Sequence, residues 1–136
     1  MTFRRGDILW MRCDPSIGVE PTKTRPCVVV SNDRANGDPD WPSVTVVSTR
    51  GYSKQDAWRP YLVDIRAPRS TLKDGRFANC SQVMTWDRAR IARHDGRLSL
   101  DAVIDVDRAL KLHLSLDEEL LEVHERQVEF DARRAG

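Results

Sequence analysis

The stretch TRPCVVVS, residues 24–31, decides the fold because an apolar run follows directly on an arginine and a proline. Proline has no backbone N–H and holds the residue before it in an extended conformation. Within a sheet it suits the first position of a strand, so we expect a buried strand over Cys27–Ser31 with Pro26 at its entrance. Arg25 is therefore predicted to lie at a fixed strand edge and not in a loop that moves freely.

Four further short β-type runs accompany this strand, separated by clusters of Gly, Pro, Asn and Asp. We expect strands over Asp7–Arg12, Val44–Ser48, Tyr61–Ile65 and Phe77–Met84. The intervening segments 13–23, 33–42 and 49–60 are long for hairpin loops, and long loops on a small rigid scaffold often carry function. The working surface is therefore expected in these loops.

The hydrophobic period changes after Leu98, where apolar residues begin to recur every three or four positions from Val103 to Leu114. Ser99 can cap a helix over this segment. Residues 87–92 are expected to form a shorter helical turn. Several twisted strands closed by one helix predict a mainly β, α+β fold, a small SH3-like barrel with a C-terminal helix.

The chain of 136 residues is long enough for one compact core. No window approaches the roughly 18 apolar residues of a membrane span, and the N-terminus has no signal-peptide pattern. We therefore expect a cytoplasmic protein that makes no membrane contact. The three cysteines are widely separated, which indicates reduced structural thiols, and the three histidines have no metal-ligand spacing. No metal or other cofactor is predicted.

The formal net charge of +1 conceals a polarised chain. Residues 1–97 carry 17 Lys and Arg against 11 Asp and Glu, whereas residues 98–136 carry 5 against 10. Most cations of the first part are arginines, whose planar donor forks suit phosphate and can stack on bases. This asymmetry fits a nucleic-acid partner and fits equally well an ordinary solvated surface.

Seven short motifs follow one another across residues 4–114. They are Arg5-Gly6-Asp7-Ile8, Asp14-Pro15 with Gly18 and Glu20, Thr24-Arg25-Pro26, Val28-Val29-Val30-Ser31-Asn32-Asp33, Val46-Val47-Ser48-Thr49, Gln82, and Ala109-Leu110-Lys111-Leu112. In this order and spacing they resemble the MazF/PemK toxins. Residues 1–116 would form the toxin domain, and residues 117–136 an acidic C-terminal extension that is helical or partly disordered.

The resemblance implies the toxin of a type II toxin–antitoxin pair, with the SH3-like barrel of the MazF/PemK/CcdB type. Such a toxin is a homodimeric, metal-independent endoribonuclease that a small cognate antitoxin silences. It would cut single-stranded RNA sequence-selectively through attack of the 2′-hydroxyl, leaving a 2′,3′-cyclic phosphate and a 5′-hydroxyl. The RNA would be mRNA, with tRNA or rRNA as alternatives.

The resemblance also implies a catalytic set. The family's arginine before the proline maps onto Arg25, and its threonine at the end of the third strand maps onto Thr49. Ser48 is the alternative hydroxyl, and because side chains alternate faces along a strand, we expect only one of the two to face the groove.

A third candidate, Glu20, matches the glutamate of the family's Gly-x-Glu segment. Arginine stays protonated at neutral pH and is a poor proton acceptor, so Glu20 is the candidate base for the 2′-hydroxyl proton. The alternative is that it only pairs with Lys23 or Arg25 on the surface.

Further candidates would bind RNA away from the reacting phosphate. Aromatic rings in the long loops could stack unpaired bases at about 1–3 kcal/mol each, and nearby cations could bind phosphates. These rings could equally anchor the loops to the barrel. The predicted RNA-binding residues are Lys23, Arg34, Arg50, Tyr52, Trp58, Arg59 and Gln82.

Two other functions remain open at this level. A CcdB-like gyrase poison has the same fold, but those toxins resemble one another at an apolar, tryptophan-containing C-terminus, whereas this chain ends Arg133-Arg134-Ala135-Gly136. A non-enzymatic SH3-like binding module is the second alternative. RNA cleavage in EDTA would separate the ribonuclease from both.

Overall fold

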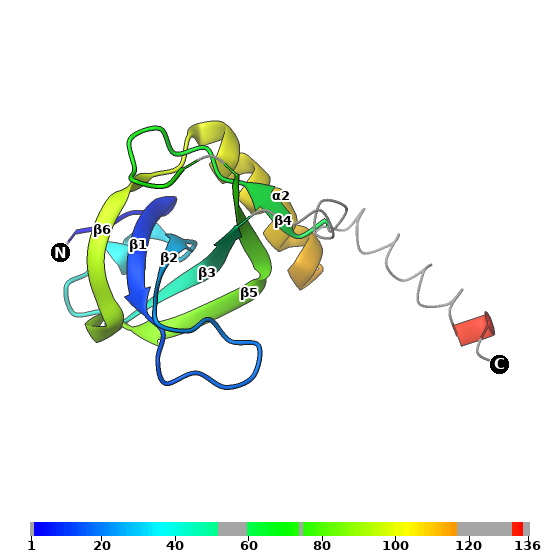
Figure 1. The fold of residues 1–136 in the computed structure, drawn as a ribbon, viewed down its shortest axis with the longest axis horizontal. Coiled ribbons are helices and arrows are strands. Elements are labelled where there is room, and N and C mark those ends of the chain that lie inside the picture. The colour runs from blue at the N-terminus through cyan, green and yellow to red at the C-terminus, as the bar shows by residue number, and fades with distance from the viewer. Residues whose placement is uncertain (1, 52–59, 74, 117–131, 135–136) are drawn as a thin grey trace.

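The computed structural model describes residues 2–51, 60–73, 75–116 and 132–134. Within them, six strands form one antiparallel sheet in the order β4-β5-β3-β2-β1-β6. The sheet curls around an interior, and α2 lies along one side of it near β4 (Figure 1). The strands are β1 (Asp7–Arg12), β2 (Thr24–Val29), β3 (Ser43–Gly51), β4 (Leu62–Asp64), β5 (Arg76–Asp87) and β6 (Ile91–Arg97). The helices are α1 (Asp33–Asn36), the 3-10 helix η2 (Arg88–Arg90) and α2 (Leu100–Leu114).

The apolar run of β2 is buried because each face of the sheet contacts a separate core. Val28 packs in the core that the sheet shares with α2, whereas Cys27 and Val29 pack in a second core on the opposite face. The first core contains Ile8, Val28, Val47, Val63, Ile65, Ala78, Cys80, Leu98, Ala102, Val106, Ala109 and Leu110. The second contains Phe3, Leu9, Met11, Cys13, Cys27, Val29, Val44 and Val46. This mainly β architecture with a C-terminal helix confirms the predicted fold class.

One prediction about the strands is wrong, and one strand was not predicted. The strand with Pro26 begins at Thr24, so the proline is its third residue and lies opposite Trp10 of β1. The short helical turn predicted within residues 87–92 is present as the three-residue η2, and the chain then continues into β6, which we did not predict. As an edge strand of the described sheet, β6 pairs with β1 alone, and its one buried residue is Asp95, so it has no alternating apolar signal.

The helix α2 begins as predicted, with the Ser99 hydroxyl accepting the N–H of Ala102. Two ion pairs join the helix to segments that flank strands. Asp107 pairs with Arg5, which precedes β1, and Asp105 pairs with Arg66, which follows β4. These carboxylates, together with the buried apolar face of α2, fix how the helix packs.

The three cysteines are free and buried, as predicted. Burial, followed by the nearby charge of Asp107, raises the pKa of the Cys80 thiol to about 12. In the described chain, no helix has the length and apolar character that crossing a membrane requires. The acidic extension predicted over residues 117–136 lies outside the described residues, except that 132–134 are helical.

Candidate active site

The candidate active site lies where β2 and β3 stop pairing. The ladder ends with Cys27 opposite Ser48, and the next pair in register would be Pro26 with Thr49. The N and C=O of one residue point to the same side of a strand, and the Pro26 carbonyl faces β3. The N–H that proline lacks is therefore the one that β3 would have used. The Thr49 hydroxyl donates instead to the Pro26 carbonyl oxygen at 2.7 Å.

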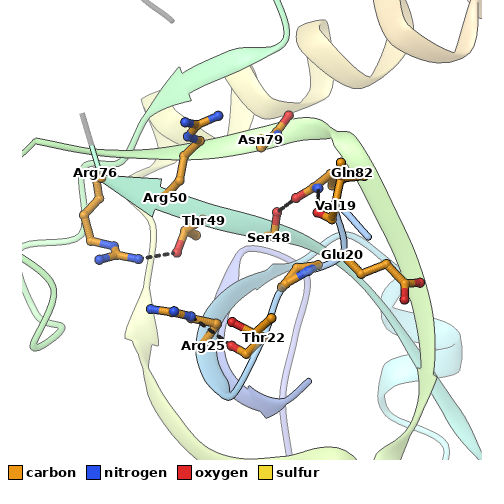
Figure 2. Close-up of a pocket in the computed structure, with 12 residues that line it drawn as sticks. Val19, Glu20, Thr22, Arg25, Ser48, Thr49, Arg50, Arg76, Asn79 and Gln82 are labelled. Atoms are coloured by element: carbon orange, nitrogen blue, oxygen red, sulfur yellow. Dashed lines mark hydrogen bonds between the residues drawn. The ribbon is translucent and has the colours of Figure 1, made fainter. Parts of the chain in front are cut away.

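The diverging strands leave a pocket of about 400 Å³ between β2, β3, β5 and the loop that precedes β2 (Figure 2). Its lining is mostly polar, with cations from three different strands. The lining residues are Val19, Glu20, Pro21, Thr22, Arg25, Ser48, Thr49, Arg50, Gly51, Arg76, Asn79 and Gln82.

Arg25 projects from β2 into this pocket. Its Nε donates to the carbonyl oxygen of Thr22 at 2.9 Å, which holds the plane of the guanidinium group. The group points towards the side of Thr49 on which Arg76 also lies (Figure 2). The two terminal nitrogens of Arg25 can therefore each donate to an anion in the pocket.

The expectation that only one neighbouring hydroxyl faces the pocket is wrong, because both Ser48 and Thr49 line it. At this point the register of β3 with β5 shifts: Val47 pairs with Val83, but Ser48 pairs with Asn79, so the extra residues lie on β5. Both residues are buried, at 3% and 7% exposure.

The two hydroxyls make different contacts. Ser48 donates to the Gln82 side-chain oxygen at 2.5 Å, and the Gln82 amide donates to the carbonyl of Val19 at 2.9 Å. Ser48 and Gln82 therefore tie the loop before β2 to the sheet. The Thr49 hydroxyl accepts a bond from Arg76 Nη2 at 3.1 Å while it donates to Pro26. Thr49 thus belongs to the cationic part of the pocket.

Glu20 lines the pocket, but its carboxylate is turned away from Arg25 and Thr49 (Figure 2). It accepts the backbone N–H of Ile17 at 2.7 Å, which closes a turn within the loop. In this conformation Glu20 stabilises the loop and does not contact the cations.

The predicted RNA-binding residues are only partly brought together. Arg50 and Gln82 line the pocket. Lys23 and Arg34 are exposed but are not among the lining residues, and Arg34 lies on the separate short helix α1. The remaining three, Tyr52, Trp58 and Arg59, lie outside the described residues.

Sequence reasoning missed Arg76 and Asn79, both on β5. They reach the pocket through the pairing of β3 with β5, which sets Gly51 opposite Arg76 and Ser48 opposite Asn79. A local signal existed for the first of them, since Arg76 directly precedes the predicted strand Phe77–Met84. Burial, followed by the like charge of Arg25, lowers the pKa of Arg76.

Metal-ligating residues do not cluster here. Among the residues that the structure describes, no three His, Cys, Asp or Glu side chains lie close enough to hold one ion. The chemistry that the described pocket offers is hydrogen bonding from guanidinium, hydroxyl and amide groups. Such donors suit an anionic ligand with several oxygen atoms.

Comparison with known proteins identifies the class. A family model described as "PemK-like, MazF-like toxin of type II toxin-antitoxin system" matches residues 4–114. The chain belongs to this family of toxins, as its sequence motifs indicated.

The chain matches two relatives over nearly the whole length of each relative. "Endoribonuclease MazF9" of Mycobacterium tuberculosis is 35% identical over 115 residues, which cover 84% of this chain and 98% of the relative. "Endoribonuclease MazF" of Staphylococcus epidermidis is 32% identical over 116 residues, covering 85% and 93%.

Solved structures agree in fold. MazF (Form-I) of Deinococcus radiodurans superimposes with a TM-score of 0.67 at 19% identity, covering 85% of this chain and 98% of that one. A mycobacterial endoribonuclease in complex with its cognate antitoxin gives a TM-score of 0.64 at 21% identity, with the same coverage. At these identities the likeness supports the fold alone, and it agrees with the six-stranded sheet and C-terminal helix described above.

Proposed function

We propose that this protein is an endoribonuclease toxin that cleaves single-stranded RNA with no metal ion or other cofactor. In the reaction, the 2′-oxygen bonds to the adjacent phosphorus and the bond to the 5′-oxygen breaks. The products are a 2′,3′-cyclic phosphate and a 5′-hydroxyl, whose proton is supplied by solvent. One observation carries the proposal: Arg25 stands at the open end of the β2–β3 ladder, beside the buried Thr49 hydroxyl, in a pocket lined by cations.

Arg25 would stabilise the phosphorane. The negative charge on the non-bridging oxygens doubles as the 2′-oxygen attacks, so donors that are already oriented favour the transition state over the substrate. The bond from Arg25 Nε to Thr22 orients the guanidinium before RNA binds. No rotation of the group is then required at the moment of reaction.

Thr49 is the proposed second catalytic residue, and Ser48 is not preferred. The Ser48 hydroxyl is committed to Gln82 and the loop. The Thr49 hydroxyl contacts Arg76, and it can turn from Pro26 towards a phosphate oxygen without leaving the pocket. It would then add a neutral donor to the charged ones.

Glu20 is the proposed base. To reach a 2′-hydroxyl it has to release the Ile17 N–H, which is a change confined to an exposed loop side chain. Replacement of Glu20 by Gln keeps the side-chain shape and removes the basicity, so kcat should fall by about 100-fold or more with RNA affinity retained. A Glu20→Gln enzyme with unchanged kcat would show that another group takes the proton.

The RNA-binding role extends to Arg50 and Gln82, which line the pocket. Residues Lys23, Arg34, Tyr52, Trp58 and Arg59 remain proposed contacts for flanking nucleotides. We also propose that the protein acts in the cytoplasm on mRNA, as a homodimer that a cognate antitoxin silences. Membership of the toxin family supports these partners, and light scattering of the purified protein would test the dimer.

The deciding experiment incubates the protein with a mixed-sequence single-stranded RNA in EDTA and identifies the ends. We expect a 2′,3′-cyclic phosphate and a 5′-hydroxyl. A matched RNA with one 2′-deoxynucleotide before the scissile phosphate should stay intact, and so should DNA of the same sequence. Cleavage of the 2′-deoxy RNA would exclude the proposed chemistry, and RNA left uncut would favour the gyrase-poison or binding-module alternatives.

A further inference from the structure

A second guanidinium group shares the pocket with Arg25. Arg76 is the first residue of β5, opposite Gly51 at the end of β3, and its side chain reaches over Thr49 (Figure 2). Its Nη2 donates to the Thr49 hydroxyl at 3.1 Å. Its Nε is shielded from solvent and has no hydrogen-bond partner among the residues that the structure describes.

Several arginines of the described residues are balanced by carboxylates. Ion pairs with carboxylates engage Arg5, Arg66, Arg93, Arg97 and Arg108. Within the same described ranges, neither Arg25 nor Arg76 has a carboxylate partner. Glu20 is the acidic residue of the pocket lining, and it is bonded to Ile17.

This arrangement is unfavourable unless an anion completes it. A buried N–H without an acceptor loses its hydration and gains nothing in return. Two guanidinium groups that face one pocket also repel each other, which agrees with the effect of Arg25 on Arg76. A phosphodiester provides the negative charge that both groups lack, and acceptor oxygens for their remaining N–H groups.

We propose that Arg76 is a second catalytic arginine that binds the same scissile phosphate as Arg25. Each guanidinium group donates to one of the two non-bridging oxygens, and Thr49 lies between them. Arg76 keeps its protons throughout, and its hydrogen bonds strengthen as those oxygens gain charge. This inference rests on the proposed endoribonuclease function and adds a residue to it.

The first test compares Arg76→Ala, Arg76→Lys and Arg108→Ala in steady-state cleavage of RNA. Removal of one preorganised donor should lower kcat by about 100-fold in Arg76→Ala. Lysine keeps the charge but presents a single point donor, so Arg76→Lys should recover part of the rate. Arg108→Ala removes an equal charge from an exposed site on α2, and its kcat should stay within about twofold of the wild type.

A second readout separates contact with phosphate from mere support of Thr49. The two diastereomers of an RNA with one sulfur at the scissile phosphate place that sulfur on different non-bridging positions. If Arg76 binds one oxygen, the rate penalty for sulfur at that position should shrink in Arg76→Lys, while the penalty at the other position persists. If the penalty for each diastereomer is the same in Arg76→Lys as in the wild type, Arg76 only supports Thr49, and the proposal is overturned.

The outcomes also separate this inference from the function on which it rests. Wild-type protein that leaves RNA uncut would remove the proposed function. Cleavage by wild type that is lost in Arg25→Ala but retained at full kcat in Arg76→Ala would overturn the role of Arg76 alone. Should Arg76→Ala fail to fold, the Arg76→Lys comparison with both diastereomers still decides the question.

Discussion

The two halves of β2 differ in pairing and in burial. From Cys27 to Val29, β2 is bonded to β3 and buried on both faces. From Thr24 to Pro26 it pairs with β1 alone, and its side chains there include an exposed arginine. We call Cys27–Val29 the closed half and Thr24–Pro26 the open half. The two meet at Pro26, which lacks the backbone N–H that would continue the ladder. The closed half contributes to the two cores, and the open half carries the proposed site.

Hydrogen bonds from neighbouring elements hold the open half in place. Thr49 replaces the lost backbone bond to Pro26, and Gln82 ties the loop before β2 to the sheet. The polar groups therefore keep their positions without a continuous ladder. A rigid frame around an incomplete polar cluster is the arrangement expected of a preorganised site.

Removing the Arg25 side chain should abolish the activity proposed for the open half without destabilising the closed half. In Arg25→Ala, we expect the rate of RNA cleavage to fall by about 100- to 1000-fold, equivalent to about 3–4 kcal/mol of transition-state stabilisation. The melting temperature should stay within a few degrees, because Arg25 is exposed. Single-turnover kinetics and thermal unfolding would measure the two effects. Activity equal to that of the wild type would contradict the assignment of Arg25.

A substitution in the core should destabilise the closed half and leave the activity of the open half unchanged. Val28 is 1% exposed in the core shared with α2, so Val28→Ala should lower the free energy of unfolding by about 2 kcal/mol. Urea unfolding would measure this loss. The kcat of the folded fraction should be unchanged, and a large fall in kcat would mean that the two halves are coupled through the core.

Thr49 lies on the boundary, so its replacement should affect both properties to a smaller extent. Thr49→Val leaves the Pro26 carbonyl without its donor and should cost about 1 kcal/mol of stability, together with a lower kcat. Thr49→Ser is the matched control because it keeps the hydroxyl. Urea unfolding and cleavage assays should show recovery in the serine variant. A serine variant as impaired as the valine variant would show that the methyl group is what matters.

The smallest expected effect concerns a buried charge that does have partners. Burial opposes ionisation of Asp95, but hydrogen bonds from Thr71 and Trp10 outweigh it and lower its pKa. A lowered carboxylate pKa stabilises the fold above the unfolded value of about 3.9, and this contribution is lost as the pH falls through the folded value.

Trp10→Phe removes the indole donor to Asp95. Its stability should therefore depend less steeply on pH below about 4 than that of the wild type. Urea unfolding between about pH 3 and about pH 6, which includes the range where carboxylates ordinarily titrate, would measure how the free energy of unfolding changes with pH. Identical slopes would mean that the indole bond does not contribute to the pKa of Asp95.

Much of the site was predictable because its determinants are local. Pro26 restricts Arg25 within one peptide unit, and Ser99 caps α2 through a contact three residues away. The apolar run after Pro26 predicted a buried strand for the same reason. Rules that act over a few residues can be read without a structure.

Three features could not be read in this way. The approach of Arg76 depends on the pairing of β3 with β5, which joins residues 51 and 76 across a long connection. That both Ser48 and Thr49 line the pocket depends on where the β2–β3 ladder ends and on the register shift between β3 and β5. The strand β6 carries too few apolar residues for a period to appear.

The amino-acid sequence thus determined the class of fold, the toxin family and the position of Arg25, because backbone restriction and hydrophobic spacing act locally. The tertiary structure decided which side chains meet. It brought Arg76 to Thr49, turned the Glu20 carboxylate towards its own loop, and left Lys23 and Arg34 outside the pocket. Contacts between distant strands depend on register and curvature, and these are set only when the whole sheet packs against its two cores.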